Sequence, residues 1–208
     1  MGQNVYIVDD DREVRRSITF MLTAAKLQPR PFASGPDFLD SLSELQPGVI
    51  LLDLHMPEMD GFRFLAELAS KRVEWPVLVM TGHGDISTAV RAMKLGAVDF
   101  LAKPFPEEAL LAALEASFTL LKDRTEMAQR RRTAEARVAA LSARENEVLR
   151  GLIAGLSNKE LAQRIGISLR TVEMHRANMM ERLEVEGLAE ALALAARAGV
   201  DPLQGQPA

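Results

Sequence analysis

Acidic and other polar side chains stand at the ends of four short aliphatic runs in the first part of this 208-residue chain. One run is followed by Asp9 and Asp10, another ends at Asp53, and two later runs lead to Thr81 and Lys103. Parallel strands bring their carboxyl ends to one edge of a sheet, where doubly wound folds bind ligands. If these runs are parallel strands, three carboxylates, a hydroxyl group and an ammonium group meet in one pocket.

Such a pocket suggests metal-assisted phosphoryl chemistry. Three neighbouring carboxylates repel one another, so at neutral pH either one is protonated or a cation lies among them. Mg²⁺, a hard cation that keeps several waters, fits these oxygen ligands. One carboxylate could then attack phosphorus while the ion and Lys103 offset the charge on the phosphoryl oxygens. We assign the nucleophile to Asp53, on the predicted central strand.

The runs that position these residues alternate with helical patterns through residue 120. Helix-start signals between them include Ser34 with Pro36, and Asp85. Five strands that alternate with five helices predict an α/β fold, with helices on both faces of an open parallel sheet. The predicted strands lie within residues 5–8, 27–32, 48–53, 76–80 and 98–102.

Composition bounds the class of protein. With 48% hydrophobic and 26% charged residues, the chain reads as globular rather than disordered. The sequence has no apolar run near the length of a membrane span, and the start has no secretory pattern. The absence of cysteine excludes disulfides and thiolate metal sites and fits a reducing compartment. We therefore expect a cytoplasmic protein without a membrane partner.

The charge differs between the two parts of the chain, which suggests two domains with different partners. Residues 1–120 hold 11 Lys and Arg against 17 Asp and Glu, and the remainder holds 14 against 12, so their formal charges are −6 and +2. We predict a first domain at 1–120, a helical linker at 121–140, an all-α domain at 141–201 and a tail at 202–208. The linker continues the fifth helix in this prediction, and a long coiled coil is the alternative.

Helical patterns fill the second domain, and two of them begin with the S-x-x-E spacing of a capping box. A short helix, a glycine turn and a longer helix are the arrangement of a helix-turn-helix. The signals are SARE at 142–145, SNKE at 157–160, the turn GIS at 166–168 and the stretch 188–199.

Periodicity assigns two faces to the longer helix of this pair. At about 100° per residue, Met179 and Leu183 fall within about 20° of Val172, which predicts the core face. The candidates for the major groove lie on the opposite side: Arg170, Met174, Ala177 and Glu181, flanked by Glu173 and Asn178. Composition alone fits a DNA-binding surface and an ordinary solvated surface equally well.

The first domain resembles a two-component receiver domain through IVDDD at 7–11, DLHMPEMDG at 53–61, MTGHGD at 80–85 and DFLAKPF at 99–105. The resemblance implies a flavodoxin-like (βα)5 sheet with strand order 2-1-3-4-5 and a phosphoacceptor at Asp53. It also implies a Mg²⁺ site formed by Asp10, Asp53 and the backbone carbonyl of His55, with Asp9 acting through water.

Four further roles follow from the same resemblance. Thr81 contacts the phosphoryl group, and Lys103 pairs with it. The bond from Lys103 to Pro104 is expected to be cis. Phe100 occupies the aromatic switch position, which is often tyrosine, so a switch that needs the hydroxyl group is not available to this chain. His55 and His83 are expected to be loop residues, because hard cations seldom bind imidazole.

The second domain is similar, from Leu141 to Leu183, to LuxR-type DNA-binding domains of the NarL/FixJ subfamily. The resemblance implies that the helix beginning near Leu169 enters the major groove and that the last helix, near 188–198, supports dimerisation. Glu173, Met174 and Ala177 match the base-facing positions, although some members have basic residues at the first and third. The expected phosphate contacts are Asn158, Lys159, Arg170, Thr171 and His175. Arg176, near the core seam, fits a structural role as well.

Together the resemblances imply a bacterial response regulator, closest to the FixJ type. A sensor histidine kinase would phosphorylate Asp53, and the receivers would pair through the face formed by helix four, strand five and helix five. Two helix-turn-helix units would then bind promoter DNA, with RNA polymerase as a further candidate partner. The chain would assist its own phosphorylation but would not be a turnover enzyme.

Three alternatives stay open. The Asp9-x-Asp11 spacing also resembles the nucleophile motif of haloacid-dehalogenase-type phosphohydrolases, which would place the covalent phosphate on Asp9. The chain could instead be a phosphorylation-independent DNA-binding regulator with a vestigial acidic pocket. Finally, the helical domain could bind hairpin RNA in antitermination.

Overall fold

The computed structural model describes residues 3–82 and 86–203. It divides into two compact units, Met1–Thr125 and Glu126–Ala208, and each is described by itself. The domain boundaries expected at 120, 140 and 201 stay predictions. The predicted helix start at Asp85, the loop role of His83 and most of the expected tail lie outside the described residues.

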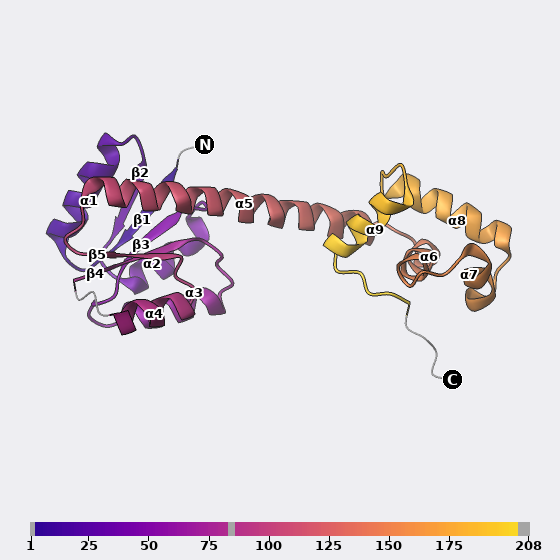
Figure 1. The fold of residues 1–208 in the computed structure, drawn as a ribbon, viewed down its shortest axis with the longest axis horizontal. Coiled ribbons are helices and arrows are strands. Elements are labelled where there is room, and N and C mark those ends of the chain that lie inside the picture. Colours follow the sequence, from indigo (N-terminus) through magenta and orange to yellow (C-terminus); the bar gives the residue numbers. More distant parts are fainter. Residues whose placement is uncertain (1–2, 83–85, 204–208) are drawn as a thin grey trace. The chain divides into compact units, whose positions relative to one another are not determined.

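The first unit contains a five-stranded parallel sheet with the order β2-β1-β3-β4-β5, which confirms the predicted fold class and strand order (Figure 1). Each strand overlaps one of the five predicted runs and differs from it by one residue at one or both ends. The strands are β1 (Asn4–Val8), β2 (Gln28–Phe32), β3 (Val49–Asp53), β4 (Val77–Thr81) and β5 (Asp99–Ala102). The helices that follow them are α1 (Arg12–Ala24), α2 (Gly35–Ser41), α3 (Gly61–Ser70), α4 (Ile86–Lys94) and α5 (Glu107–Ala139), with a short 3-10 helix at Leu42–Glu44.

Helices cover both faces of this sheet, because neighbouring strand residues point to opposite sides. Val5 and Ile7 of β1 pack with α1 and α5, whereas Tyr6 and Val8 pack with α2, α3 and α4. Strands β3 and β4 are buried along their whole lengths. Their side chains are continuously apolar up to the last residue, as expected for parallel strands with two covered faces.

The turn after β3 brings Gly61, the first residue of α3, against the end of that strand. A Cβ atom at this position would lie 2.8 Å from the backbone oxygen of Asp53 and 2.7 Å from Cδ2 of Leu54. The Gly61 amide also donates to the Leu54 carbonyl at 3.0 Å. A glycine at this position therefore lets the loop that carries the end of β3 close tightly.

Replacing Gly61 with alanine is expected to lower the free energy of unfolding by about 1–3 kcal/mol, because backbone atoms must shift to admit the methyl group. Urea unfolding, monitored through the fluorescence of the single tryptophan, Trp75, measures this change. Gly82→Ala is the control, since a Cβ there meets nothing within 4 Å. Equal stability of the two variants would contradict the close approach.

Helix α5 is 33 residues long and continues through the segment expected to be a helical linker. Leu110 and Leu114 belong to the core of the first unit, and Ala134 belongs to the core of the second. Between them, Arg130 pairs with Glu126 and Arg131 with Glu135, and both arginine side chains are 70% exposed. These exposed pairs are those of a solvated charge run. The coiled-coil alternative requires a second chain and stays a prediction.

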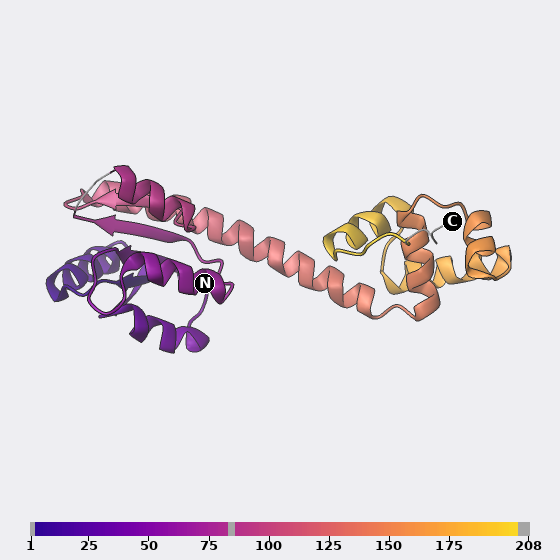
Figure 2. The same ribbon diagram turned by 90° about the horizontal axis from the view of Figure 1, so that it is seen from below.

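The second unit holds the predicted four helices, coloured from orange to yellow in Figure 2: α6 (Ala143–Ile153), α7 (Asn158–Ile165), α8 (Leu169–Arg182) and α9 (Leu188–Arg197). Both predicted capping boxes are present, at Ser142 with Glu145 and at Ser157 with Glu160. Gly166, with φ of 69°, ends α7 in the left-handed conformation that favours glycine. The α7–turn–α8 arrangement confirms the predicted helix-turn-helix.

Candidate functional site

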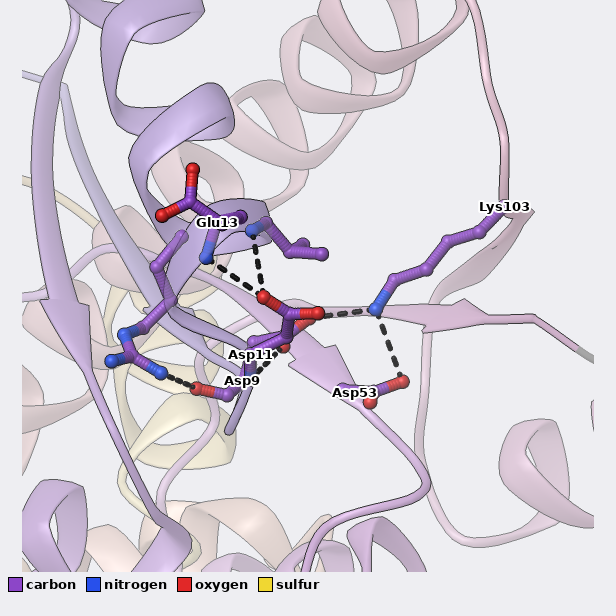
Figure 3. Close-up of polar contacts among 7 residues, drawn as sticks. Asp9, Asp11, Glu13, Asp53 and Lys103 are labelled. Atoms are coloured by element: carbon purple, nitrogen blue, oxygen red, sulfur yellow. Dashed lines mark hydrogen bonds and ion pairs between the residues drawn. The ribbon is translucent and has the colours of Figure 1, made fainter.

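The carboxyl ends of three strands bring together two aspartates and a lysine (Figure 3). The Nζ atom of Lys103, after β5, lies 2.7 Å from Oδ2 of Asp9, after β1, and 3.4 Å from Oδ1 of Asp53, the last residue of β3. The backbone N–H of Lys103 donates to the carbonyl of Thr81 at 2.7 Å, which ties the lysine to the end of β4. The predicted convergence at one sheet edge is thus present.

Asp9 is fully buried, and both of its carboxylate oxygens have partners. Oδ1 accepts from the backbone N–H of Asp11 at 2.9 Å, and Oδ2 accepts from Lys103. Its backbone carbonyl accepts from the guanidinium of Arg15 at 2.7 Å. Asp11 points toward α1 and caps that helix by accepting from the backbone N–H groups of Glu13 and Val14 (Figure 3). Asp9 is therefore held in place, and Asp11 is engaged outside the pocket.

A divalent cation fits the acidic group formed by Asp9, Asp10 and Asp53. Each residue offers one carboxylate oxygen, and these atoms lie within 4.8 Å of one another. Asp10 is exposed, whereas the other two are buried, so the group opens to solvent on one side. Oxygen ligands alone, with an open side for water, are what Mg²⁺ prefers. The side chain of His55, two residues beyond Asp53, is exposed.

Burial raises the pKa of Asp53 above its ordinary value. The nearby Lys103 ammonium opposes this rise, and the carboxylate of Asp9 adds to it. A buried carboxylate beside a second carboxylate is unfavourable when both are ionised, because each loses hydration and the two repel. The site therefore favours additional positive charge, as the oxygen ligands also indicate.

The remaining predicted pocket residues lie at the same edge or next to it. Thr81 is buried at the end of β4, and its Cα pairs with that of Ala102 on β5. The Lys103–Pro104 bond is cis, as expected. Phe100 lies two residues before Ala102 on β5 and is 41% exposed. These positions are consistent with the expected roles, but the roles themselves stay predictions.

The two faces of α8 are those that periodicity predicts. Val172, Met179 and Leu183 are fully buried in the core of the second unit. The residues on the predicted outward side and its flanks are exposed: Arg170, Glu173, Met174, Ala177, Asn178 and Glu181. Thr171 and His175 are half-buried, and Lys159 on α7 is exposed. The side chains expected to face DNA thus share one accessible surface of the helix-turn-helix.

One expected phosphate contact has a structural partner that the sequence did not reveal. Asn158 is half-buried, and its Oδ1 accepts a hydrogen bond from the guanidinium of Arg176 at 3.2 Å. The bond joins the first residue of α7 to the middle of α8. It supports the structural role considered for Arg176 and leaves the amide group of Asn158 as the donor for a phosphate.

A buried carboxylate that sequence reasoning missed supports the carboxyl end of α8. Glu145 is 2% exposed, accepts from the backbone N–H of Ser142 at 2.8 Å and lies 3.4 Å from the guanidinium of Arg182. The hydrogen bonds from Ser142, with smaller contributions from Arg182 and His175, hold the pKa of Glu145 below its ordinary value despite burial. The SARE motif indicated the capping box, but not the contact of Glu145 with Arg182, which lies 37 residues later.

Glu145→Gln is expected to reduce the local stability of α6 and α8 by about 1.5–3 kcal/mol at pH 7, the range for hydrogen bonds to charged groups. Because folding lowers this pKa, the carboxylate stabilises the protein above its unfolded pKa of about 4.5. That contribution is lost as pH falls through the lower folded value. Hydrogen exchange of the α6 and α8 amides from pH 7 to 3 measures the difference.

Glu160→Gln is the matched control, because Glu160 caps α7 in the same way but is exposed. Its effect on exchange should be smaller, since water screens an exposed carboxylate. An equal effect of the two substitutions would show that the burial of Glu145 and its contact with Arg182 are unimportant.

Comparisons with known proteins match both units. Residues 5–115 match the family described as response regulator receiver domain, and residues 139–195 match bacterial regulatory proteins, luxR family. The transcriptional regulatory protein FixJ of Bradyrhizobium diazoefficiens is 42% identical over 197 residues, which cover 95% of this chain and 96% of that protein. The response regulator protein TodT of Pseudomonas putida is 36% identical over 88% of this chain and 81% of its own.

Solved structures agree with these similarities. The response regulator StyR matches with a TM-score of 0.82 and 36% identity, over 95% of this chain and 100% of its own. Full-length FixJ from B. japonicum matches with a TM-score of 0.59 and 42% identity, over 95% of this chain and 97% of its own. In the part of the chain that the structure describes, no helix is both long and apolar enough to cross a bilayer.

Proposed function

Because this chain belongs to the FixJ-type two-component response regulators, which join a receiver domain to a LuxR-type DNA-binding domain, we propose that a sensor histidine kinase switches it by phosphorylating Asp53. The protein is a transcription factor regulated by phosphorylation. The observation that carries the proposal is the buried Asp53 carboxylate beside Lys103 at the carboxyl edge of the sheet.

The contacts of the two buried aspartates favour Asp53 as the nucleophile. Both oxygens of Asp9 are engaged, one by the Asp11 amide and one by Lys103 at 2.7 Å. Asp53 accepts a backbone hydrogen bond from Leu54 and has the longer, 3.4 Å contact with the same ammonium group. A carboxylate with a less committed oxygen is better able to attack phosphorus, which argues against the haloacid-dehalogenase alternative with its nucleophile at Asp9.

The remaining pocket residues take supporting roles in this proposal. Mg²⁺, bound by Asp10, Asp53 and the His55 carbonyl with Asp9 acting through water, would neutralise phosphoryl charge. Lys103, already 3.4 Å from Asp53, pairs with the transferred group. The hydroxyl group of Thr81 contacts a phosphoryl oxygen. The chain accepts and loses the group in this way without acting as a turnover enzyme.

An apolar stripe on the receiver supplies a surface for dimerisation. Ile86, Val90 and Met93 follow one another at the i, i+4, i+7 spacing of a single face of α4, and they are 80%, 47% and 45% exposed. Phe100 of β5 is 41% exposed. We infer that phosphorylated receivers pair through α4, β5 and α5, so that two helix-turn-helix units bind a two-fold symmetric promoter site. Contact with RNA polymerase stays a prediction from the family.

Incubation with acetyl phosphate and Mg²⁺, followed by intact-mass measurement and peptide mapping, tests the proposal. We expect one phosphoryl group per chain, on the peptide that contains Asp53, and tighter binding to duplex promoter DNA. An adduct on Asp9 would instead support the haloacid-dehalogenase alternative. No adduct, together with unchanged DNA binding, would support a phosphorylation-independent regulator with a vestigial pocket. Preference for hairpin RNA over duplex DNA would support antitermination.

A further inference from the structure

The exposed face of α8 combines apolar side chains with one acceptor-only side chain. Met174 is 50% exposed, although the methionine five positions later, Met179, is fully buried. Ala177, one turn after Met174, and Glu173 beside it are also exposed. These three residues stand at the positions of the helix expected to approach base edges, so their chemistry limits which bases they can distinguish.

Ala177 has no polar side-chain group, and the thioether sulfur of Met174 is only a weak hydrogen-bond acceptor. Guanine presents two acceptors in the major groove, which arginine or lysine reads, and adenine presents a donor and an acceptor, which asparagine or glutamine reads. Thymine alone presents a methyl group, and apolar side chains contact it there. The base-specific contact open to Met174 and Ala177 is therefore the thymine methyl group.

Glu173 adds a different requirement. Among the residues that the structure describes, its carboxylate has no hydrogen bond or ion pair. An ionised carboxylate accepts hydrogen bonds but donates none, and it is repelled by the phosphates that flank the groove. It becomes favourable there when it accepts from an exocyclic amino group, and the amino group of cytosine is the one that Glu and Asp characteristically read.

We propose that α8 selects its operator through a thymine methyl group contacted by Met174 and Ala177 and a cytosine amino group bound by Glu173. This inference rests on the DNA-binding function of the second unit and specifies the bases that the unit reads. Exposed Lys159 and Arg170 supply phosphate attraction, which holds the helix on DNA without distinguishing sequence.

Single-atom changes in the DNA test the thymine contact. Duplexes that bind the full-length, acetyl-phosphate-treated protein are first selected from a random pool, and each thymine is then replaced by deoxyuridine, which lacks only the methyl group. We expect one position per half-site at which the wild type loses about fourfold in affinity, the value for burial of one such carbon. Met174→Ala should bind the thymine and deoxyuridine duplexes equally.

Met127→Ala is the control, since Met127 is an exposed methionine on α5 in the same unit. It should keep the full preference of the wild type for thymine over deoxyuridine. The thymine contact would be overturned if Met174→Ala kept the preference for thymine over deoxyuridine. It would also be overturned if the wild type showed this preference at no position.

The cytosine contact is tested by replacing each cytosine with 2-pyrimidinone, which lacks the 4-amino group. The loss of affinity by the wild type at one position should be about tenfold, the effect of a hydrogen bond to a charged group. Because the analogue also weakens the base pair, the readout is the comparison with Glu173→Ala, which should show no such loss beyond this common effect. Glu186→Ala, with its exposed carboxylate in the loop after α8, should behave as the wild type.

The same titrations separate a failure of this inference from a failure of DNA binding itself. If the wild type binds duplex DNA with the usual dependence on salt but Glu173→Ala loses as much affinity as the wild type at every analogue, the base assignment is wrong and DNA binding stands. If no duplex is enriched or bound, the proposed function fails as well.

Discussion

The Asp53→Asn variant is expected to gain no phosphoryl group from acetyl phosphate and Mg²⁺, whereas the wild type gains one. The amide oxygen of asparagine is a poor nucleophile and cannot form the acyl phosphate, although it fills the same volume. The substitution leaves the 2.7 Å pair between Lys103 and Asp9 in place, so the pocket should keep its shape. Intact-mass measurement of both proteins after the same incubation gives the result.

Asp60→Asn is the matched control for this experiment. Asp60 lies seven residues beyond Asp53 and caps α3 by accepting from the backbone N–H of Arg63 at 2.7 Å. Asparagine caps helices about as well as aspartate, so this variant should fold and be phosphorylated normally. A full adduct in Asp53→Asn would contradict the assignment, and its location by peptide mapping would identify the true acceptor.

The Asp53→Asn variant should unfold less readily than the wild type when Mg²⁺ is absent. Because folding raises the pKa of Asp53, stability from this group is present below its unfolded pKa and is lost as pH rises through the folded value. As pH rises through the folded value the wild type loses that stability, whereas asparagine does not titrate. Urea unfolding monitored by Trp75 should show a higher midpoint for Asp53→Asn, and Mg²⁺ should stabilise only the wild type appreciably.

The elements of the fold could be predicted because their signals are local. The apolar run before Asp53 is continuous because both faces of β3 are covered, and this pattern depends only on neighbouring residues. The caps at Ser142 and Ser157 likewise depend on residues three positions apart. The rule that parallel strands end at one edge was enough to place Asp9, Asp53 and Lys103 together before their distances were known.

The partners of individual side chains could not be predicted, because they depend on how distant elements pack. The sequence indicated that Lys103 joins the acidic pocket, but not that its shorter contact is with Asp9 rather than Asp53. It did not reveal that Arg176 binds Asn158 across 18 positions. The residues of the Lys103–Asp9 pair and of the Arg176–Asn158 pair are not at a spacing that one helix or one strand would impose. Only the folded structure therefore shows these contacts.

The second large effect is expected at the apolar stripe of α4. Val90→Asp should keep the phosphorylated protein monomeric, with a dimer dissociation constant raised roughly 100-fold. A two-fold interface places this residue in both subunits, so it would bury two unpaired carboxylates, each costing about 1–3 kcal/mol. Equilibrium sedimentation with and without acetyl phosphate measures the change. Val90 is 47% exposed in the single chain, so the substitution itself should leave folding largely intact.

Phe20→Asp provides the control for this surface. Phe20 of α1 is 78% exposed, and α1 covers the opposite face of the sheet from α4, so the same chemical change lies away from the stripe. This variant should dimerise normally, because its new carboxylate lies outside the proposed interface. Normal dimerisation of Val90→Asp, or loss of dimerisation in Phe20→Asp, would show that the dimer interface lies elsewhere.

Loss of dimerisation in Val90→Asp should also weaken binding to a two-fold promoter site more than binding to a half-site, because linking two DNA-binding units raises the effective concentration of the second.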